Sequence, residues 1–248
     1  MKIGIDCRIY SSKFTGIGRY VYELVQRIAE LDQYNQYVLF FNNPEFDEFT
    51  PPNDRFKKVL VDVPIYSLKE QTKFLKALNK EKLDLMHFTH FNAPVFYKRP
   101  SVVTIHDLTL SFYPGKKNKS LLKRLGYHLT IRSAVHHAKR VITISQNSKK
   151  DLKKLIGTPE EKIEVIYQGV GEEFKPVDDR ARLDKTLKKY NIQNPFLLYT
   201  GVWRYHKNLP NLMKAFHQIR TEFDLSNLKL AITGKEDPYY PEVKETIK

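Results

Sequence analysis

Short β-rich runs alternate with longer helical patterns along almost the whole chain, and this alternation limits the folds that it can adopt. Runs such as SVVTIH (101–106) and RVITIS (140–145) are apolar at successive positions, which is typical of strands buried on both faces of a parallel sheet. Apolar residues at helical spacing fill the segments between such runs. The sequence therefore predicts an α/β fold with a Rossmann-like, doubly wound sheet. We expect strands near 2–6, 36–42, 56–61, 84–88, 101–106, 140–144 and 163–167, and helices near 17–31, 67–80, 118–138 and 146–156.

The pattern breaks after Gly169 and then restarts. We interpret 1–172 as a Rossmann-like domain, 173–194 as a linker with a polar helix, and 195–248 as an incomplete second Rossmann-like domain. The second part predicts only two strands, near 195–201 and 228–234, with a helix near 208–223 between them. Two strands cannot cover both faces of a doubly wound sheet. We therefore expect the second part to be a fragment or to need another source of cover, such as a homodimer through 195–248.

Composition narrows the cellular setting. The one cysteine, Cys7, cannot form an intrachain disulfide, and a cysteine-based zinc site is excluded. The chain has neither an apolar run of about 18 residues nor an N-terminal apolar signal core. A reducing cytoplasm fits these features best.

Positive charge is concentrated in one stretch. The chain carries a net charge of +14, and 113–154 contains twelve Lys and Arg residues against one acid, Asp151. Such a stretch attracts phosphates, an anionic membrane surface or nucleic acid. The alternative is a solvated helix face that serves solubility alone.

The helix expected after the first strand begins with unfavourable residues. Gly16 and Gly18 lie in its first turn, and Arg19 places a cation at the positive end of the helix dipole. Glycine amides at a helix N-terminus can cradle an anion, and a bound anion would also account for Arg19. The alternative for each glycine is a plain turn.

Ligands of open parallel sheets bind beyond the carboxyl ends of the strands. At the end of the run at 101–106, His106 is followed by Asp107, and we take both as candidate catalytic residues. A histidine satisfied by a loop carbonyl is the alternative for His106. After the strand at 195–201 come Arg204 and Lys207. Like Arg19, Lys207 places a cation at the expected start of a helix. The two helix starts together suggest an anion shared by two domains.

Several familiar motifs are absent. A dinucleotide fingerprint would need glycine where Val21 stands, and the chain contains neither a G-x-x-x-x-G-K-[ST] loop nor a G-x-S-x-G elbow. We expect no metal and no cofactor other than a donor substrate.

Seven segments and one proline carry a resemblance to a known family. In chain order the sequence resembles the GT-B-fold retaining glycosyltransferases of family 4, especially the mannosyltransferase-like members of group 1, over about residues 2–234. The matching parts are TGIGRY (15–20), SLKEQTKFLKAL (67–78), LDLMHFTHFNAP (83–94), VVTIHDL (102–108) with Pro114, VITISQNSKKDL (141–152), EKIEVIYQGV (161–170) and LLYTGVWRYHKNLPNLMKAF (197–216).

The resemblance implies an acceptor-binding first domain and a second domain that binds a nucleoside diphosphate sugar. It implies that Gly16 and Gly18 approach the donor diphosphate, that His106 contacts the transferred sugar, and that Lys207 neutralises the leaving diphosphate.

This chain departs from the family pattern at two places. The arginine that usually accompanies the lysine would stand at Val202 or His206, which leaves Arg204 as the substitute candidate. The family's paired acidic motif E-x7-E, which belongs to the donor-binding domain, would lie beyond Lys248.

These features together predict a retaining hexosyltransferase, with mannose as a candidate sugar, that acts in the synthesis of cell-surface polysaccharide. We expect a glycan or lipid-linked acceptor, a cytoplasmic location at the inner membrane face, and membrane contact through 113–154. Two alternatives remain: a nucleic-acid-binding protein that uses the same basic stretch, and a non-catalytic acceptor-domain fragment. Nucleic acid is disfavoured because the stretch has few aromatic residues for stacking, Tyr113 and Tyr127, and no recognised motif.

Overall fold

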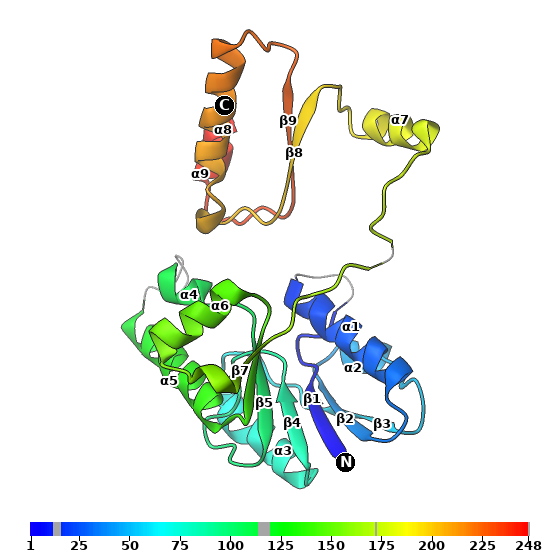
Figure 1. Ribbon diagram of the computed structural model, residues 1–248, viewed down its shortest axis with the longest axis vertical. Coiled ribbons are helices and arrows are strands. Elements are labelled where there is room, and N and C mark those ends of the chain that lie inside the picture. Colours follow the sequence, from blue (N-terminus) through cyan, green and yellow to red (C-terminus); the bar gives the residue numbers. More distant parts are fainter. Residues whose placement is uncertain (12–15, 114–119, 172, 248) are drawn as a thin grey trace. The chain divides into compact units, whose positions relative to one another are not determined.

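The computed structural model describes residues 1–11, 16–113, 120–171 and 173–247. The chain divides into two compact units (Figure 1). The first contains Met1–Phe112 and Ser120–Gly169, and the second contains Val170–Lys248.

The first unit is built on a seven-stranded sheet in which every neighbouring pair is parallel. The strand order is β3-β2-β1-β4-β5-β6-β7, so the direction of winding reverses between β1 and β4. This order confirms the predicted doubly wound α/β fold. The strands are β1 Lys2–Asp6, β2 Gln36–Phe41, β3 Phe56–Leu60, β4 Leu85–Phe88, β5 Ser101–Ile105, β6 Arg140–Thr143 and β7 Ile163–Val165, close to the predicted ranges.

The longer helices also follow the predicted pattern. They are α1 Gly16–Leu31, η1 Glu70–Phe74 running into α3 Leu75–Lys80, α5 Leu121–His137, and α6 Gln146–Asp151 running into η3 Leu152–Ile156. Among the described residues of the first unit, three short elements were not predicted, because a segment of four residues or fewer shows no detectable periodicity. They are α2 Glu45–Glu48, α4 Thr109–Phe112 and η4 Glu160–Lys162.

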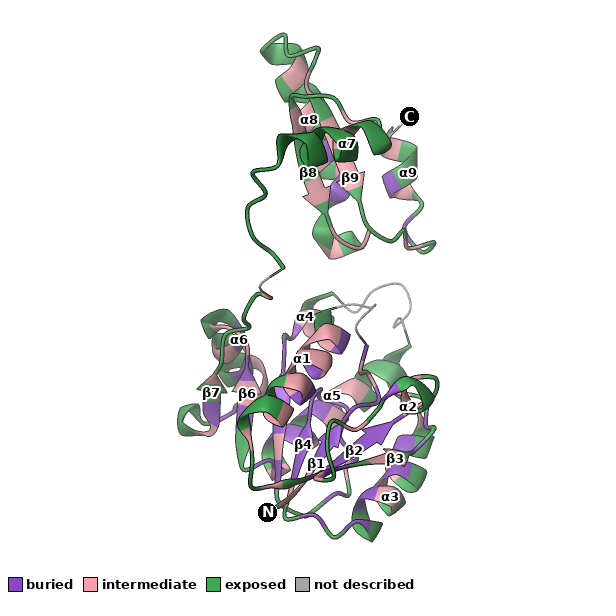
Figure 2. Ribbon diagram, turned by 90° about the vertical axis from the view of Figure 1, so that its right-hand side faces the viewer, coloured by how far each residue is buried: buried purple, intermediate pink, exposed green. Residues whose placement is uncertain are grey.

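Two apolar clusters lie on opposite faces of this sheet, and β2 shows why its sequence is apolar without alternation. Phe40 packs with Phe74 and Leu78 of η1 and α3, whereas its neighbour Phe41 packs with Val21 of α1. Successive side chains of a strand point to opposite faces, so a strand covered on both sides must be apolar throughout. Each buried phenylalanine contributes roughly 1.5–3 kcal/mol. Figure 2 shows the buried residues gathered in these central strands.

The second unit contains α7 Arg180–Lys189, the parallel pair β8 Phe196–Thr200 and β9 Lys229–Thr233, η5 Tyr205–Lys207, and the helices α8 Leu209–Glu222 and α9 Glu242–Ile247. Its described core of buried side chains is small, with Leu209, Met213, Tyr240 and Val243. Adjacent Leu197 and Leu198 of β8 face opposite ways and remain 48% and 60% exposed. Within the described residues, no helix is both long enough and apolar enough to cross a bilayer.

Candidate functional site

Polar side chains gather where β1, β4 and β5 end, beside the point at which the strand order reverses. Asp6 and Arg8 belong to the end of β1, Thr89 and His90 follow β4, and His106 follows β5. All five are buried. Open parallel sheets bind their ligands at this position.

His106 is held from four directions and is 6% exposed. Its Nε2 lies 3.0 Å from the carbonyl oxygen of Thr89, and its Nδ1 lies 3.4 Å from the side-chain amide nitrogen of Gln168, which follows β7. The ring of Tyr20 in α1 meets the imidazole edge to face, with centroids 4.8 Å apart. The Ser148 hydroxyl of α6 donates to the His106 carbonyl at 3.0 Å. Thr89, Gln168 and Tyr20 therefore orient the imidazole, and Ser148 holds the backbone of the same residue.

Burial lowers the pKa of His106, although the hydrogen bond to Thr89 and the charge of Asp107 act in the opposite direction. The imidazole is therefore neutral at neutral pH. Asp107 is exposed, and its Oδ1 accepts the backbone N–H of Thr109 at 2.9 Å at the start of α4. Within the described residues, no hydrogen bond joins the Asp107 carboxylate to the imidazole. The structure thus places Asp107 as a local turn-stabilising residue beside His106.

Two further buried histidines lie next to His106 and were missed at the sequence level. The His87 Nε2 lies 2.8 Å from the Thr104 hydroxyl, and burial lowers the pKa of His87 to about 4. The His90 Nε2 lies 2.8 Å from the Tyr66 hydroxyl, and burial lowers the pKa of His90 to about 3. Listing the residues that follow the strand at 84–88 would have found His90. His87 lies inside the strand, where the sequence pattern shows only a polar residue within an apolar run.

A buried cation between two carboxylates holds the loops behind these histidines. The Arg8 side chain is fully buried, with Nη2 2.7 Å from Asp6 Oδ2 and Nη1 2.6 Å from Glu70 Oε1. Its guanidinium lies 3.8 Å from the centre of the Phe74 ring. Asn92 donates to Glu70 Oε1 at 2.6 Å, which ties the segment after β4 to the same network. Removing either carboxylate would leave a buried charge poorly compensated.

The other oxygen of Glu70 supports an unusual backbone conformation. Tyr66 has a φ of 62°, in the left-handed region that residues with a side chain rarely adopt. Its N–H donates to Glu70 Oε2 at 2.7 Å, and its ring stacks on Phe91. The Glu70 carboxylate therefore helps to hold the tyrosine whose hydroxyl meets His90.

The two glycines that open α1 differ in their surroundings. A Cβ added at Gly18 would lie 2.9 Å from the Ile9 carbonyl oxygen, so the close approach of α1 to the chain after β1 requires glycine there. A Cβ at Gly16 would meet no atom of the described residues within 4 Å, so no contact among them requires glycine there. Arg19 forms an ion pair with Glu23 one turn later at 2.6 Å. This pair gives a local reason for the cation and weakens the argument that Arg19 by itself requires an anion.

In the second unit, the candidate residues lie in the loop between β8 and α8. Gly201 directly follows β8, and a Cβ at Gly234 after β9 would lie only 1.9 Å from the Gly201 carbonyl oxygen, so the backbone after one strand packs against the backbone after the other. Arg204 and Lys207 are exposed, and among the described residues neither forms an ion pair with a carboxylate. α8 begins after Asn208, whose side chain makes no capping hydrogen bond. This loop thus offers two uncompensated cations beside an uncapped helix start.

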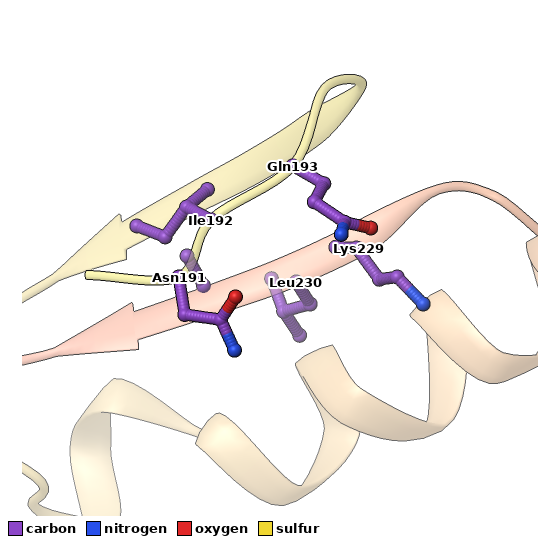
Figure 3. Close-up of a pocket in the computed structure, with 6 residues that line it drawn as sticks. Asn191, Ile192, Gln193, Lys229 and Leu230 are labelled. Carbon is purple, nitrogen blue, oxygen red and sulfur yellow. The ribbon is translucent and has the colours of Figure 1, made fainter. Parts of the chain in front are cut away.

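A pocket of about 330 Å³ in the second unit does not coincide with these residues. It is lined by Asn191, Ile192, Gln193, Lys229, Leu230 and Ala231 (Figure 3). Residues 191–193 precede β8, and Lys229 begins β9. The pocket therefore lies toward the amino ends of the strands, away from the carboxyl edge where such sheets bind ligands. Within the parts of the chain that the structure describes, no group of three His, Cys, Asp or Glu side chains is placed to hold a metal ion.

The basic stretch forms a surface in which apolar and cationic side chains alternate. Leu121, Leu122, Leu125 and Leu129 of α5 are between 56% and 80% exposed, and Lys123, Arg124 and Arg132 are exposed as well. Val135, nearer the end of α5, is buried in the core and does not belong to this exposed face. Lys116, Lys117 and Lys119 lie outside the described residues. Phe112 of α4 is also exposed, and the hydrogen bond between Ser111 and Tyr127 joins α4 to α5.

Comparison with known proteins places the chain in a family. Residues 14–174 match the family described as Glycosyltransferase Family 4. The chain is 22% identical over 237 residues to the O-antigen chain mannosyltransferase B of Escherichia coli, covering 90% of this chain and 61% of that protein. It is 26% identical over 126 residues to the O-antigen chain mannosyltransferase RfbU of Salmonella typhimurium, covering 51% of this chain and 31% of the relative. The chain thus spans less than two thirds of the length of these relatives.

Solved structures share the fold. WaaG, a glycosyltransferase involved in lipopolysaccharide biosynthesis, superposes with a TM-score of 0.64 at 14% identity, over 98% of this chain and 67% of WaaG. HepE of Anabaena, solved in complex with UDP and glucose, superposes with a TM-score of 0.68 at 16% identity, over 100% of this chain and 65% of HepE. The resemblance identified from the sequence is confirmed, since the family match covers more than half of the chain. This chain belongs to Glycosyltransferase Family 4 and has the GT-B type of α/β fold.

Proposed function

We propose that the chain is part of a retaining glycosyltransferase that transfers a hexose, mannose, from a nucleoside diphosphate sugar to a glycan or glycolipid acceptor. The observation that carries this proposal is His106, a neutral histidine fixed at the carboxyl edge of the first sheet. The resemblance of VVTIHDL (102–108) to the family matches His106 to the histidine that contacts the transferred sugar, and we carry that role over as part of the proposal. The relatives named as O-antigen mannosyltransferases support mannose and a polysaccharide product.

The chemistry of His106 suits the breaking of a glycosidic bond to phosphate. As the bond to the diphosphate breaks, positive charge develops on the sugar ring. A neutral imidazole can bind a sugar hydroxyl without placing a second positive charge beside that ring. A protonated histidine would oppose the same step. The lowered pKa of His106 therefore favours catalysis at neutral pH.

The leaving diphosphate is negatively charged, so it needs the positive charge that would be unfavourable beside the sugar ring. Arg204 and Lys207 provide cations without carboxylate partners among the described residues, and the uncapped start of α8 provides backbone N–H groups. Gly16, whose Cβ position meets no atom of the described residues, would let a phosphate approach the start of α1. We assign these residues to the diphosphate and propose that charge stabilisation, without a metal ion, supplies most of the rate enhancement.

The exposed surface of α4 and α5 fits a location at the cytoplasmic face of an anionic membrane. Apolar side chains such as Leu122 can enter the headgroup region while Lys123 and Arg124 meet anionic headgroups. A glycolipid acceptor would be reached from the same surface. The exposed Leu197 and Leu198 of β8 are candidates for contact with a second copy of the chain, which light scattering at several protein concentrations would detect.

The test of the proposed function is transfer of labelled sugar from GDP-mannose and from UDP-glucose to a glycolipid extract. We expect transfer by the unaltered protein and a loss of at least about 100-fold in kcat for His106→Ala, with an unchanged unfolding midpoint. Lys207→Ala should also lower kcat, whereas Lys214→Ala, on the exposed side of α8, serves as a matched control. Near-normal turnover by His106→Ala would contradict the assignment of His106 to the sugar.

A further inference from the structure

Thr89 connects His106 to the first strand of the sheet, and both of its polar groups are used in doing so. The residue is fully buried directly after β4. Its hydroxyl donates to the Asp6 carbonyl at the end of β1 at 2.6 Å, and its own carbonyl lies 3.0 Å from Nε2 of His106. The Asp6 side chain is held in turn by Arg8 through two hydrogen bonds. The backbone that meets the imidazole is thus anchored to the centre of the sheet.

These contacts decide which imidazole nitrogen of His106 carries the proton. A carbonyl oxygen can only accept a hydrogen bond, so Nε2 must carry the hydrogen that points to Thr89. The side-chain amide of Gln168 lies 3.4 Å from Nδ1 and can donate to the lone pair that this tautomer leaves there. The Thr89 carbonyl therefore selects one tautomer, and the Gln168 amide is compatible with it. Ser148 restrains the same residue from the other side by donating to its carbonyl.

We propose that Thr89 is a positioning residue that locks His106 in the Nε2–H tautomer and so presents Nδ1 to the substrate as a hydrogen-bond acceptor. This inference rests on the proposed function and deepens it, because it assigns the polarity of the contact: the group that binds Nδ1 must be a donor, such as a sugar hydroxyl. Gln168 is exposed and its amide marks the place that this hydroxyl takes.

The lock has a defined physical basis. A half-turn of the imidazole about its bond to Cβ would replace both ring nitrogens by carbons at their present contacts and lose both hydrogen bonds. Without the Thr89 hydroxyl, this residue would lose its side-chain hydrogen bond to Asp6, and the carbonyl that accepts from Nε2–H would be held less firmly. Thr89→Val removes the hydroxyl and keeps the branched shape, whereas Thr89→Ser keeps the hydroxyl and serves as the matched control.

The primary experiment is long-range ¹H–¹⁵N NMR of the histidine side chains in the full chain at neutral pH, with His106 assigned by its absence in His106→Gln. We expect the unaltered protein and Thr89→Ser to show protonated Nε2 and unprotonated Nδ1. In Thr89→Val the two nitrogen shifts should move toward each other as the second tautomer becomes populated. Protonated Nδ1 in the unaltered protein would overturn the proposal whether or not Thr89→Val folds. The same tautomer in folded Thr89→Val as in the unaltered protein would also overturn it.

Kinetics separates this inference from the proposed function. In the transfer assay we expect Thr89→Val to lower kcat on the order of 10- to 100-fold, with Thr89→Ser close to the unaltered protein, since a small misplacement of a binding group can cost this much. Absence of transfer by the unaltered protein would count against the proposed function, while the NMR result would still decide the tautomer. Full turnover by Thr89→Val despite an altered tautomer would refute the positioning role.

Discussion

Acidification from about pH 7.5 to about pH 5 is expected to destabilise the first unit, because His87 and His90 are buried as neutral imidazoles. Burial lowers the pKa of His87 from 6.5 to about 4 and that of His90 from 6.5 to about 3. Between 6.5 and these lower values, the unfolded chain binds protons that the folded chain does not. The free energy of unfolding must therefore fall as the pH falls through this window.

The size of this loss in unfolding free energy follows from the width of the pH range over which only the unfolded chain binds the protons. At about pH 5, each histidine with a folded pKa well below that pH contributes a loss of about 2 kcal/mol, since one pKa unit corresponds to about 1.4 kcal/mol. His87 and His90 together contribute about 4 kcal/mol. His106, whose pKa is also lowered by burial, acts in the same direction. A domain with a total stability of about 5–15 kcal/mol would lose much of it.

His87→Gln tests this reasoning because glutamine keeps a polar group near Thr104 and cannot take up a proton. We expect its loss of stability between the two pH values to be smaller than that of the unaltered protein by about 2 kcal/mol. His136→Gln, at an exposed position of α5, is the matched control and should show the full loss.

The measurement must report on the first unit alone. The single tryptophan, Trp203, lies in the second unit, so its fluorescence would follow the wrong part of the chain. Amide hydrogen exchange in β4 and β5 at both pH values reports the stability of the relevant sheet. An equal pH-dependent loss in His87→Gln and in the unaltered protein would refute the account. His90→Gln provides the same test if His87→Gln does not fold.

Three other outcomes are expected. Gly18→Ala should be less stable than Gly16→Ala by about 1–3 kcal/mol in thermal unfolding, because only Gly18 faces a backbone oxygen at 2.9 Å from the added Cβ; equal midpoints would contradict this. Glu70→Gln should cost about 3–5 kcal/mol in urea unfolding, because Arg8 keeps only one carboxylate in the sheet interior; a cost below about 1 kcal/mol would argue against the network. Replacing Lys123 and Arg124 by Gln should weaken flotation with anionic liposomes by about 1 kcal/mol for each charge. Unchanged flotation, or equal binding to neutral liposomes, would count against electrostatic attraction.

Local pattern was enough for the framework of this fold. A strand such as β5 must be apolar at successive positions to be covered on both faces, and that requirement is visible in the sequence without any knowledge of its neighbours. The position of His106 could be predicted for the same reason, because a residue that ends such a strand lies at the carboxyl edge of the sheet. The small core of the second unit could also be predicted, since it follows from having two strands.

The pairings that give the candidate site its chemistry could not be predicted in this way. Arg8 and Glu70 are 62 positions apart, and Thr89 and Asp6 are 83 positions apart. No local periodicity specifies such contacts, which depend on how the loops after β1, β4 and β5 pack against one another. Arg19 is different, because its partner is local. Its cation at the start of the helix forms an ion pair with Glu23 one turn away. Sequence alone therefore determined which residues reach the edge of the sheet. Only the tertiary structure decided their protonation and partners, because burial and hydrogen bonding arise from segments that meet only after the chain has folded.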